Sequence, residues 1–348
     1  MFRKLFAKKA SAKVALSGGP TFEVARNETV LEAALKAGIA YPHDCTVGTC
    51  GSCKSRLLQG KVDAITPFGY TLSREELQAG YILACQAVPE SDLLVDVPLG
   101  GAPIRKVAAR IALQQDLTHD IRFVTWETDS PVDFRAGQYM NVSWPGGPGP
   151  RSYSFSTAPV EGGRQRLSAF IRRVPGGAFT EALFAGQLDD AAFTLEAPHG
   201  TFWLREGSGP IVLVGGGSGL SPLMSVLEDA VAKGTARDAI LLFGGRTERD
   251  LYYLSEIAAI GERWQGRFEF RPVLSEAKAE GMRFGLVTEE IPGALTDLGN
   301  VAATQAYMCG PPGMIDAGLA ALLAAGVPLA SVHYDKFTDA STGKKQAG

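Results

Sequence analysis

The 348-residue sequence contains few of the side chains that usually carry acid–base and metal chemistry, with only four histidines and five cysteines. It has no apolar run of about eighteen residues, so we expect no helix that spans a membrane. The net charge of -3 lacks the positive excess that a nucleic-acid partner requires. The few cysteines give no disulfide framework, and free thiols are typical of a reducing cytoplasm, which is the expected location.

The N-terminal residues 1–9 are basic but lack the apolar core of a secretory leader, so we do not expect export. One short turn carrying Phe2, Leu5 and Phe6 buries little apolar area, which favours a frayed tail over a membrane contact. We expect a monomer, and we expect any membrane contact to be peripheral and made through a partner protein.

The length of the chain and the local sequence patterns predict three domains. Between about 105 and 206, short β-like segments separated by Pro and Gly predict an antiparallel barrel. After Pro210, apolar strands alternate with helices, which predicts a doubly wound parallel sheet. The expected divisions are a first domain at 1–98 with 1–11 as a tail, a linker at 99–104, the barrel at 105–206 and the parallel sheet at 207–348.

Four cysteines follow a C-x4-C-x2-C spacing with a distant fourth member: Cys45, Cys50, Cys53 and Cys85. This pattern is typical of thiolates that hold a [2Fe–2S] cluster. A structural zinc site is the main alternative, but such sites usually pair two short C-x2-C units. Gly48 and Gly51 allow positive φ angles, which bring backbone N–H groups close to sulfur. The sequence therefore predicts an iron–sulfur loop.

The segment ahead of this loop has a hairpin pattern at 13–16 and 21–24. Thr29 and Glu32 then form a capping box before a short helix that Gly38 ends. This order of hairpin, helix and cysteine loop resembles the plant-type ferredoxin domain, over about residues 12–98. The resemblance implies a β-grasp fold.

Residues 151–157 read Arg-Ser-Tyr-Ser-Phe-Ser-Thr, of the form R-x-Y-S-x-x-[ST]. Taken alone, the segment fits a polar barrel strand equally well. On an antiparallel barrel it resembles the flavin motif of the ferredoxin–NADP⁺ reductase superfamily. The resemblance implies that Arg151 pairs with the FAD pyrophosphate, that Tyr153 stacks on the isoalloxazine and that Ser154 hydrogen-bonds near its reactive N5. Ser152 and Thr157 complete the expected FAD-binding segment.

A second turn of the same superfamily, G-G-x-x-[ST], is matched by Gly176, Gly177 and Thr180. The two glycines alone predict only a turn. The resemblance implies that backbone N–H groups at a helix start and the Thr180 hydroxyl meet the same pyrophosphate.

A glycine loop follows the first apolar strand of the parallel sheet: Gly215, Gly216, Gly217, Ser218 and Gly219. Its backbone suits a pyrophosphate at a helix N-terminus, but it is not the Rossmann fingerprint, because Leu220 stands where the last glycine would be. By itself the loop is a weak signal. It resembles the G-G-G-[ST]-G-[LI]-[AST]-P loop of the same superfamily, which serves NAD(P)H.

Two later segments resemble the part of that superfamily where hydride passes to the flavin. Cys309, Gly310 and Pro311 match its C-G-P-P-x-M motif, which implies that Cys309 lies at the nicotinamide, although a buried free cysteine is more often a packing residue. Phe337 matches the C-terminal aromatic that lies against the flavin, and an edge-strand aromatic is the alternative. The residues expected at the reaction centre are thus Ser154, Cys309 and Phe337.

Arg246 and Asp250 lie where the superfamily reads the adenosine ribose. An acidic residue favours a free 2′-hydroxyl, whereas arginines favour a 2′-phosphate. Asp250 therefore favours NADH, but Arg246 and Arg249 leave NADPH open.

Cluster, FAD and NADH modules in this order resemble the reductase components of bacterial multicomponent oxygenases, such as those of xylene monooxygenase and naphthalene dioxygenase. The resemblance implies an NADH-dependent enzyme that passes electrons through FAD and the cluster to an oxygenase (hydroxylase) component or its ferredoxin. A CDP-6-deoxy-glucoseen-type reductase of deoxysugar synthesis is the nearest alternative. A non-enzymatic redox sensor and a ferredoxin fused to an inert scaffold are further alternatives, and the intact FAD and NADH motifs argue against both.

Overall fold

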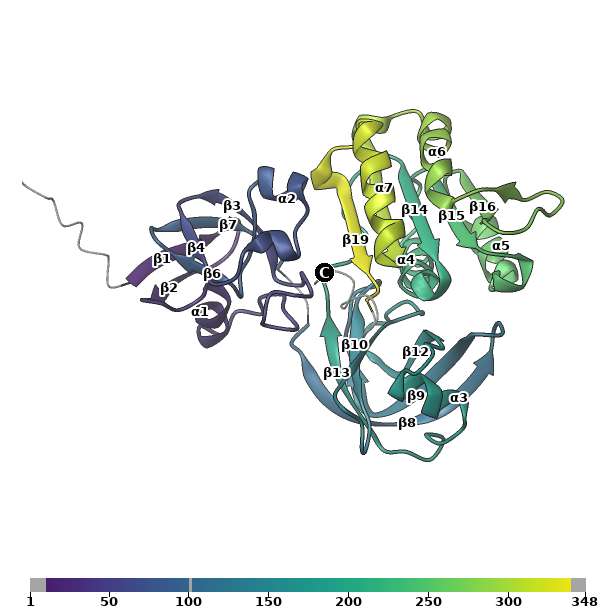
Figure 1. Cartoon of the computed structure of the whole chain (residues 1–348), viewed down its shortest axis with the longest axis horizontal. Coiled ribbons are helices and arrows are strands. Elements are labelled where there is room, and N and C mark those ends of the chain that lie inside the picture. Colours follow the sequence, from purple (N-terminus) through teal and green to yellow (C-terminus); the bar gives the residue numbers. More distant parts are fainter. Residues whose placement is uncertain (1–10, 100–101, 339–348) are drawn as a thin grey trace, which may run out of the picture. The chain divides into compact units, whose positions relative to one another are not determined.

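The computed structural model describes residues 11–99 and 102–338, which separate into two compact units. One unit holds the described residues up to Pro103 together with His199–Thr201, and the other holds Ile104–Pro198 and the residues from Phe202 onward (Figure 1). The expected N-terminal tail, which includes Phe2, Leu5 and Phe6, and the centre of the expected linker lie outside the described residues. Within the described ranges, no helix has the length and apolar character needed to cross a membrane.

The first unit is built on a five-stranded sheet in the order β2-β1-β7-β3-β5, beside a two-stranded β4-β6 sheet. β1 pairs antiparallel with β2 and parallel with β7. The capping box expected at Thr29 and Glu32 is present, and it starts a helix whose buried face packs on the sheet. This arrangement confirms the expected ferredoxin fold. Its elements are β1 (Ser11–Leu16), β2 (Thr21–Ala25), α1 (Val30–Lys36), β3 (Lys54–Gln59), β4 (Val62–Ala64), α2 (Arg74–Gln78), β5 (Tyr81–Leu83), β6 (Ala87–Pro89) and β7 (Leu93–Asp96).

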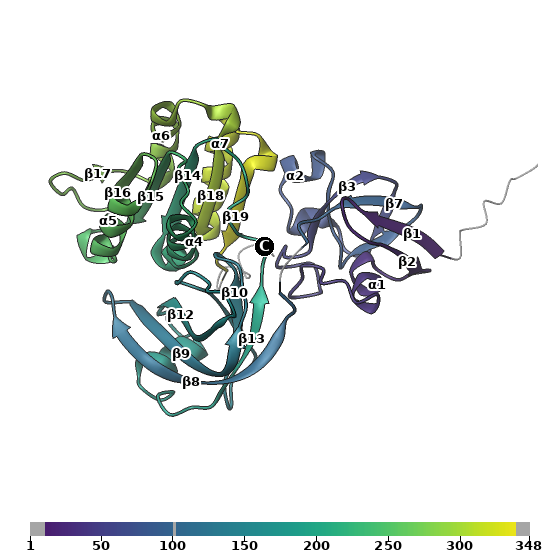
Figure 2. The same ribbon diagram turned by 180° about the vertical axis from the view of Figure 1, so that it is seen from behind.

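The second unit begins with a six-stranded, barrel-like sheet in the order β11-β10-β13-β8-β9-β12. Its strands pair antiparallel, and Figures 1 and 2 show β8 and β9 as long, curved strands. Trp126, Phe155 and Phe193 are fully buried in its core. The expected antiparallel barrel is thus confirmed. Its elements are β8 (Arg105–Asp116), β9 (Ile121–Val132), β10 (Tyr139–Ser143), β11 (Arg151–Ser154), β12 (Arg164–Arg172), α3 (Ala178–Phe184) and β13 (Phe193–His199).

The same unit continues into a parallel sheet in the order β17-β16-β15-β14-β18-β19. Side chains of β14 alternate between its faces: Leu213 belongs to the core formed with α4 and α5, and Val212 and Val214 to the core formed with α6 and α7. The sheet is therefore doubly wound, as expected. Its elements are β14 (Ile211–Gly216), α4 (Leu220–Ala232), β15 (Ala239–Gly245), α5 (Leu254–Arg263), β16 (Phe268–Leu274), β17 (Arg283–Phe284), α6 (Ile291–Leu298), β18 (Gln305–Gly310), α7 (Pro312–Ala324) and β19 (Val332–Lys336).

The order of these strands defines where a ligand binds. The chain proceeds outward from β14 to β17 and then returns to β18 on the other side of β14. In open α/β sheets, ligands bind at the carboxyl ends of the strands where the order reverses in this way. The glycine loop follows β14 and the Cys309–Pro311 segment ends β18, so both expected nicotinamide motifs lie at this switch point.

Gly219 allows the glycine loop to pack against the end of β18. A Cβ at this position would lie 2.5 Å from the carbonyl carbon of Cys309 and closer still to its oxygen. We expect Gly219→Ala to destabilise the protein by about 3 kcal/mol, because the loop must move to accept the methyl group. Gly313→Ala is the matched control, since no atom lies within 4 Å of its Cβ. Thermal unfolding of both variants tests this, and equal melting temperatures would contradict it.

Candidate redox site

The cysteine loop directs backbone N–H groups at its own sulfur atoms. The amides of Thr49 and Cys50 donate to Cys45 Sγ at 3.4 and 3.3 Å, and the Ser52 amide donates to Cys50 Sγ at 3.5 Å. Gly48 and Gly51 adopt φ angles of 84° and 76°, which are the positive values predicted for an iron–sulfur loop. Such N–H groups stabilise thiolates, so the loop fits the anionic sulfur environment of an iron–sulfur cluster.

The four thiols lie in two pairs, Cys45 with Cys50 and Cys53 with Cys85, each joined by a hydrogen bond. The bond from Cys50 lowers the pKa of Cys45, and the bond from Cys53 lowers the pKa of Cys85. A tetrahedral zinc would hold all four sulfurs about 3.8 Å apart. Among the described residues, no three of these thiols gather within 4.8 Å. Two pairs suit two irons rather than one zinc.

The flavin motif forms β11 and pairs with β10, with Tyr153 opposite Met140. The exposed Arg151 guanidinium donates to the carbonyls of Gly149 and Pro150 at 3.1 and 2.9 Å, and within the described part of the chain it forms no salt bridge. An exposed guanidinium without a carboxylate suits a phosphate ligand. The Tyr153 ring is half-buried and lies 5.2 Å from the ring of Phe179, measured between centroids.

Two hydroxyl groups of the motif are buried without a partner. Ser156 Oγ and Thr157 Oγ1 form no hydrogen bond, although buried hydroxyls normally do. The expected role of Thr157 in FAD binding gains support from this orphaned oxygen. Ser152 is less available, because its Oγ donates to Asn141 Oδ1 at 2.7 Å.

The second flavin turn starts α3. Gly176 has a φ of 72°, and a Cβ at Gly177 would lie 2.7 Å from Thr180 Oγ1. The Thr180 hydroxyl accepts from the Val174 amide at 3.1 Å, so it closes the turn. The two glycines thus leave the N-terminal backbone of α3 uncovered, as a phosphate-binding turn requires.

A polar stripe on α4 fixes the flavin motif, and the sequence interpretation missed it. Ser221 Oγ donates to the carbonyl oxygen of Ser154 at 2.8 Å, and Ser225 Oγ donates to that of Thr157 at 2.7 Å. One turn further, Glu228 accepts from the Ala158 amide at 2.9 Å, and burial raises its pKa. The signal was present as polar residues at i, i+4 and i+7 of a largely apolar helix. This stripe joins the nicotinamide sheet to the flavin segment.

At the switch point, Gly215 lies directly opposite Cys309 in the β14–β18 pairing. The Cys309 thiol is fully buried, which raises its pKa well above the ordinary value and keeps it neutral. The Phe337 amide donates to the Gly310 carbonyl at 2.9 Å, so Phe337 follows the edge strand β19 and its backbone lies at the same end of β18. Cys309 and the backbone of Phe337 therefore both lie at the carboxyl end of β18, where their expected roles would place them.

The loop after β15 is organised by Asp250. Its Oδ2 accepts from the Thr247 amide at 2.8 Å, and its Oδ1 accepts from Arg246 Nη2 at 3.0 Å. Burial opposes ionisation, but the hydrogen bonds from Thr247 and Arg246 outweigh it and lower the pKa of Asp250. Asp250 is therefore ionised, and Arg246 is bound to it rather than free.

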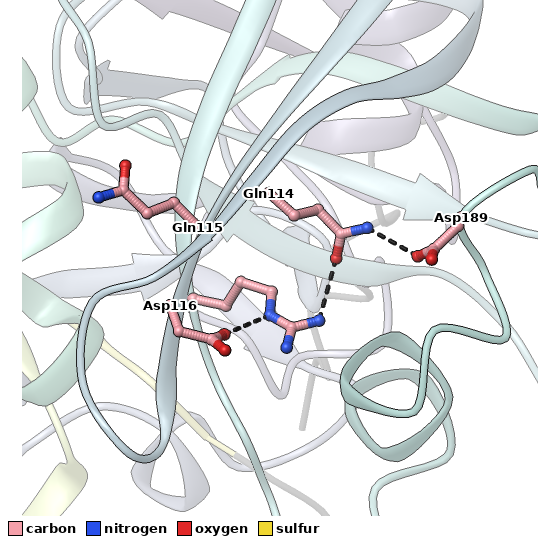
Figure 3. A pocket seen from close by; sticks show the side chains of 5 residues that line it. Gln114, Gln115, Asp116 and Asp189 are labelled. Carbon is pink, nitrogen blue, oxygen red and sulfur yellow. Dashed lines mark hydrogen bonds and ion pairs between the residues drawn. The ribbon is translucent and has the colours of Figure 1, made fainter.

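A pocket of about 250 Å³ lies elsewhere, at the turn between β8 and β9 (Figure 3). Arg122 donates there to Asp116 at 2.6 Å and to Gln114 at 3.1 Å, and Gln114 donates to Asp189 at 2.8 Å. Four of its five lining side chains are thus hydrogen-bonded to one another, and none of the expected redox residues lines it.

Three family models match the chain in succession. Residues 15–90 match the 2Fe-2S iron-sulfur cluster binding domain, 108–203 the oxidoreductase FAD-binding domain and 213–318 the oxidoreductase NAD-binding domain. The three expected cofactors, a [2Fe–2S] cluster, FAD and NADH, are thereby supported.

Relatives align over nearly the full length. The chain is 42% identical to the xylene/toluene monooxygenase electron transfer component of Pseudomonas putida, over 96% of this chain and 95% of that protein. It is 36% identical to the propane 2-monooxygenase reductase component of a Gordonia strain, over 91% and 94%. Among solved structures, the Amycolatopsis cytochrome P450 reductase GcoB is 34% identical with a TM-score of 0.72, covering 94% of this chain and 99% of that one.

Proposed function

Because this chain belongs to the family of iron–sulfur flavoprotein reductases that serve bacterial oxygenases, we propose that it supplies electrons from NADH to an oxygenase acting on an aromatic compound or another hydrocarbon. The observation that carries the proposal is the full-length similarity to the electron transfer component of xylene/toluene monooxygenase. The deoxysugar-reductase alternative gains no such support, since the relatives described above serve monooxygenases.

The chain's own residues divide the work among three sites. Bound FAD would supply the chemistry that links a two-electron donor to the one-electron cluster. Arg151, Gly176 and Gly177 would hold the flavin phosphates. Cys309 is buried and neutral, so it would line the nicotinamide site with an uncharged side chain and exclude water from it.

We place electron exit at the cysteine loop. The segment from Thr46 to Gly51 is largely exposed, with Val47 62% exposed, so a partner protein can approach the cluster thiols there. The partner would be the hydroxylase component of the oxygenase or its ferredoxin. We further propose a cytoplasmic monomer whose membrane contact, where the partner is membrane-bound, is made through that partner.

Reconstitution tests the proposal. Purified protein, NADH and a purified hydroxylase component, taken from a xylene or propane monooxygenase, should form hydroxylated product only when all three are present. Absence of product with every such hydroxylase, despite rapid NADH-dependent dye reduction, would contradict the oxygenase assignment.

Asp250 should set the preference for NADH. Its ionised carboxylate suits a ribose 2′-hydroxyl and repels a 2′-phosphate. We expect Asp250→Ala to reduce the NADH-to-NADPH ratio of kcat/KM by about 1–2 kcal/mol, or roughly tenfold. Steady-state ferricyanide reduction with each coenzyme measures the ratio, and an unchanged ratio would remove Asp250 from the ribose site.

A further inference from the structure

An ion-pair cluster joins three segments that are far apart in the sequence. The turn between β8 and β9 contributes two side chains, the end of β12 contributes one, and the loop after β15 contributes two. These residues are His119, Asp120, Arg172, Arg246 and Asp250. The first three come from the flavin barrel, so the barrel reaches the loop expected to read the adenosine ribose.

Asp120 is the carboxylate that both arginines share. Its Oδ2 accepts from Arg172 Nε at 3.1 Å and lies 3.7 Å from Arg246 Nη2. The same Arg246 nitrogen donates to Asp250 Oδ1 at 3.0 Å. Arg246 is therefore held between two carboxylates, one from each domain.

His119 lies beside these ion pairs, but its imidazole and the two carboxylates do not form a metal site. His119 Nε2 lies 3.9 Å from both Asp120 Oδ1 and Asp250 Oδ1, and the three residues form a group that resembles a cation site. Arg172 and Arg246 already neutralise both carboxylates, so a cation bound there would face two guanidinium groups. The cluster is balanced without a metal.

The two arginine side chains of the ion-pair cluster are accessible to a ligand. The side chains of Arg172 and Arg246 are 45% and 43% exposed, whereas those of Asp120 and Asp250 are mostly buried. Arg172 also lies beside the glycine loop, because a Cβ at Gly217 would be 3.5 Å from its Nη1. Asp120 thus pairs with Arg172 beside the glycine loop, which is expected to hold pyrophosphate, and with Arg246 at the expected ribose site.

We propose that Asp120, from the flavin barrel, is a specificity-determining residue for the coenzyme. Together with Asp250 it holds Arg246 in ion pairs, so that the guanidinium of this arginine is less available to a 2′-phosphate. An arginine in this loop otherwise favours NADPH. The ion pair between Asp120 and Arg246 explains how a binding site for NADH can contain an arginine at this position. The inference rests on the proposed function and assigns it a specificity residue outside the nicotinamide domain.

Asp120→Asn tests the proposal in the full-length holoenzyme, with ferricyanide as the electron acceptor. We expect the NADH-to-NADPH ratio of kcat/KM to fall about tenfold, mainly through a lower KM for NADPH. The change should shrink at high ionic strength, because it is electrostatic. Asparagine retains the Oδ1 that accepts from the Thr118 hydroxyl at 3.1 Å, so the turn should persist.

Three further variants make the test specific. Asp116→Asn is the matched control, because Asp116 ends β8 and pairs with Arg122 away from the cluster. It should leave the ratio unchanged. Asp120→Glu retains the charge and should retain the NADH preference. The double variant Asp120→Asn/Arg246→Gln should lose the NADPH gain, because that gain requires the Arg246 guanidinium, which then faces one carboxylate instead of two.

The outcomes separate the inference from the function on which it rests. An unchanged ratio in Asp120→Asn, or a gain that persists without Arg246, overturns the role of Asp120 while NADH oxidation itself remains. A wild-type protein that oxidises neither coenzyme overturns the proposed function.

Discussion

Cys85→Ala is expected to eliminate the iron–sulfur cluster and, with it, electron delivery to one-electron acceptors. Removing even an outer-shell partner of a metal ligand costs about 10–100-fold in metal affinity or activity, and a lost ligand costs more. NADH-dependent cytochrome c reduction should therefore fall by about a hundredfold or more. Ferricyanide reduction through the flavin should persist, because the flavin and nicotinamide sites lie in the other compact unit.

The fifth cysteine provides the control for this experiment. Cys309 is buried beside the glycine loop in the second unit, so Cys309→Ala should retain full iron content. Iron analysis and EPR of the reduced proteins distinguish the two variants. Full iron in Cys85→Ala, or iron loss in Cys309→Ala, would contradict the assignment of the four ligands.

Arg151→Ala is expected to release FAD and leave the cluster in place. Charge-assisted hydrogen bonds to phosphate make the loss about 3 kcal/mol, or roughly a hundredfold in the Kd for FAD. The purified variant should contain iron but little flavin, and its NADH oxidation should recover when FAD is added in excess. Titration with FAD, followed by flavin fluorescence, measures the change.

Arg110→Ala is the matched control for the flavin experiment. Arg110 is an exposed arginine on β8 of the same barrel, and it pairs with Glu127 at 2.7 Å. This variant should bind FAD normally. Simultaneous loss of flavin and cluster in Arg151→Ala would contradict the independence of the two units.

The sequence predicted those parts of the fold that depend on interactions between residues close together in the chain. The capping box at Thr29 and Glu32 and the cysteine spacing depend on residues close in sequence, and both appear as expected. Strand β9, in contrast, extends to Val132, which the sequence pattern alone does not indicate. Its polar residues Glu127 and Asp129 conceal a strand that is completed by pairing with its neighbours.

Contacts between distant residues could not be predicted in this way. Ser221 reaches the carbonyl of Ser154 across 67 positions, and Asp120 approaches Arg246 across a greater distance along the chain. Each side chain is unremarkable in its own segment, and the interaction exists only because α4 and the β8–β9 turn meet other elements in space. Helix α2 was also missed, because its five residues are too few to show a periodic pattern, although Ser73 and Glu76 cap it.

An anaerobic titration of the purified protein with NADH tests the central claim most directly, with the flavin followed by absorbance and the cluster by EPR. The account predicts that the flavin bleaches first and that the signal of a reduced [2Fe–2S] cluster then develops in proportion to the NADH added. A flavin that is fully reduced while the cluster remains oxidised would contradict the assigned path from NADH through FAD to the cluster.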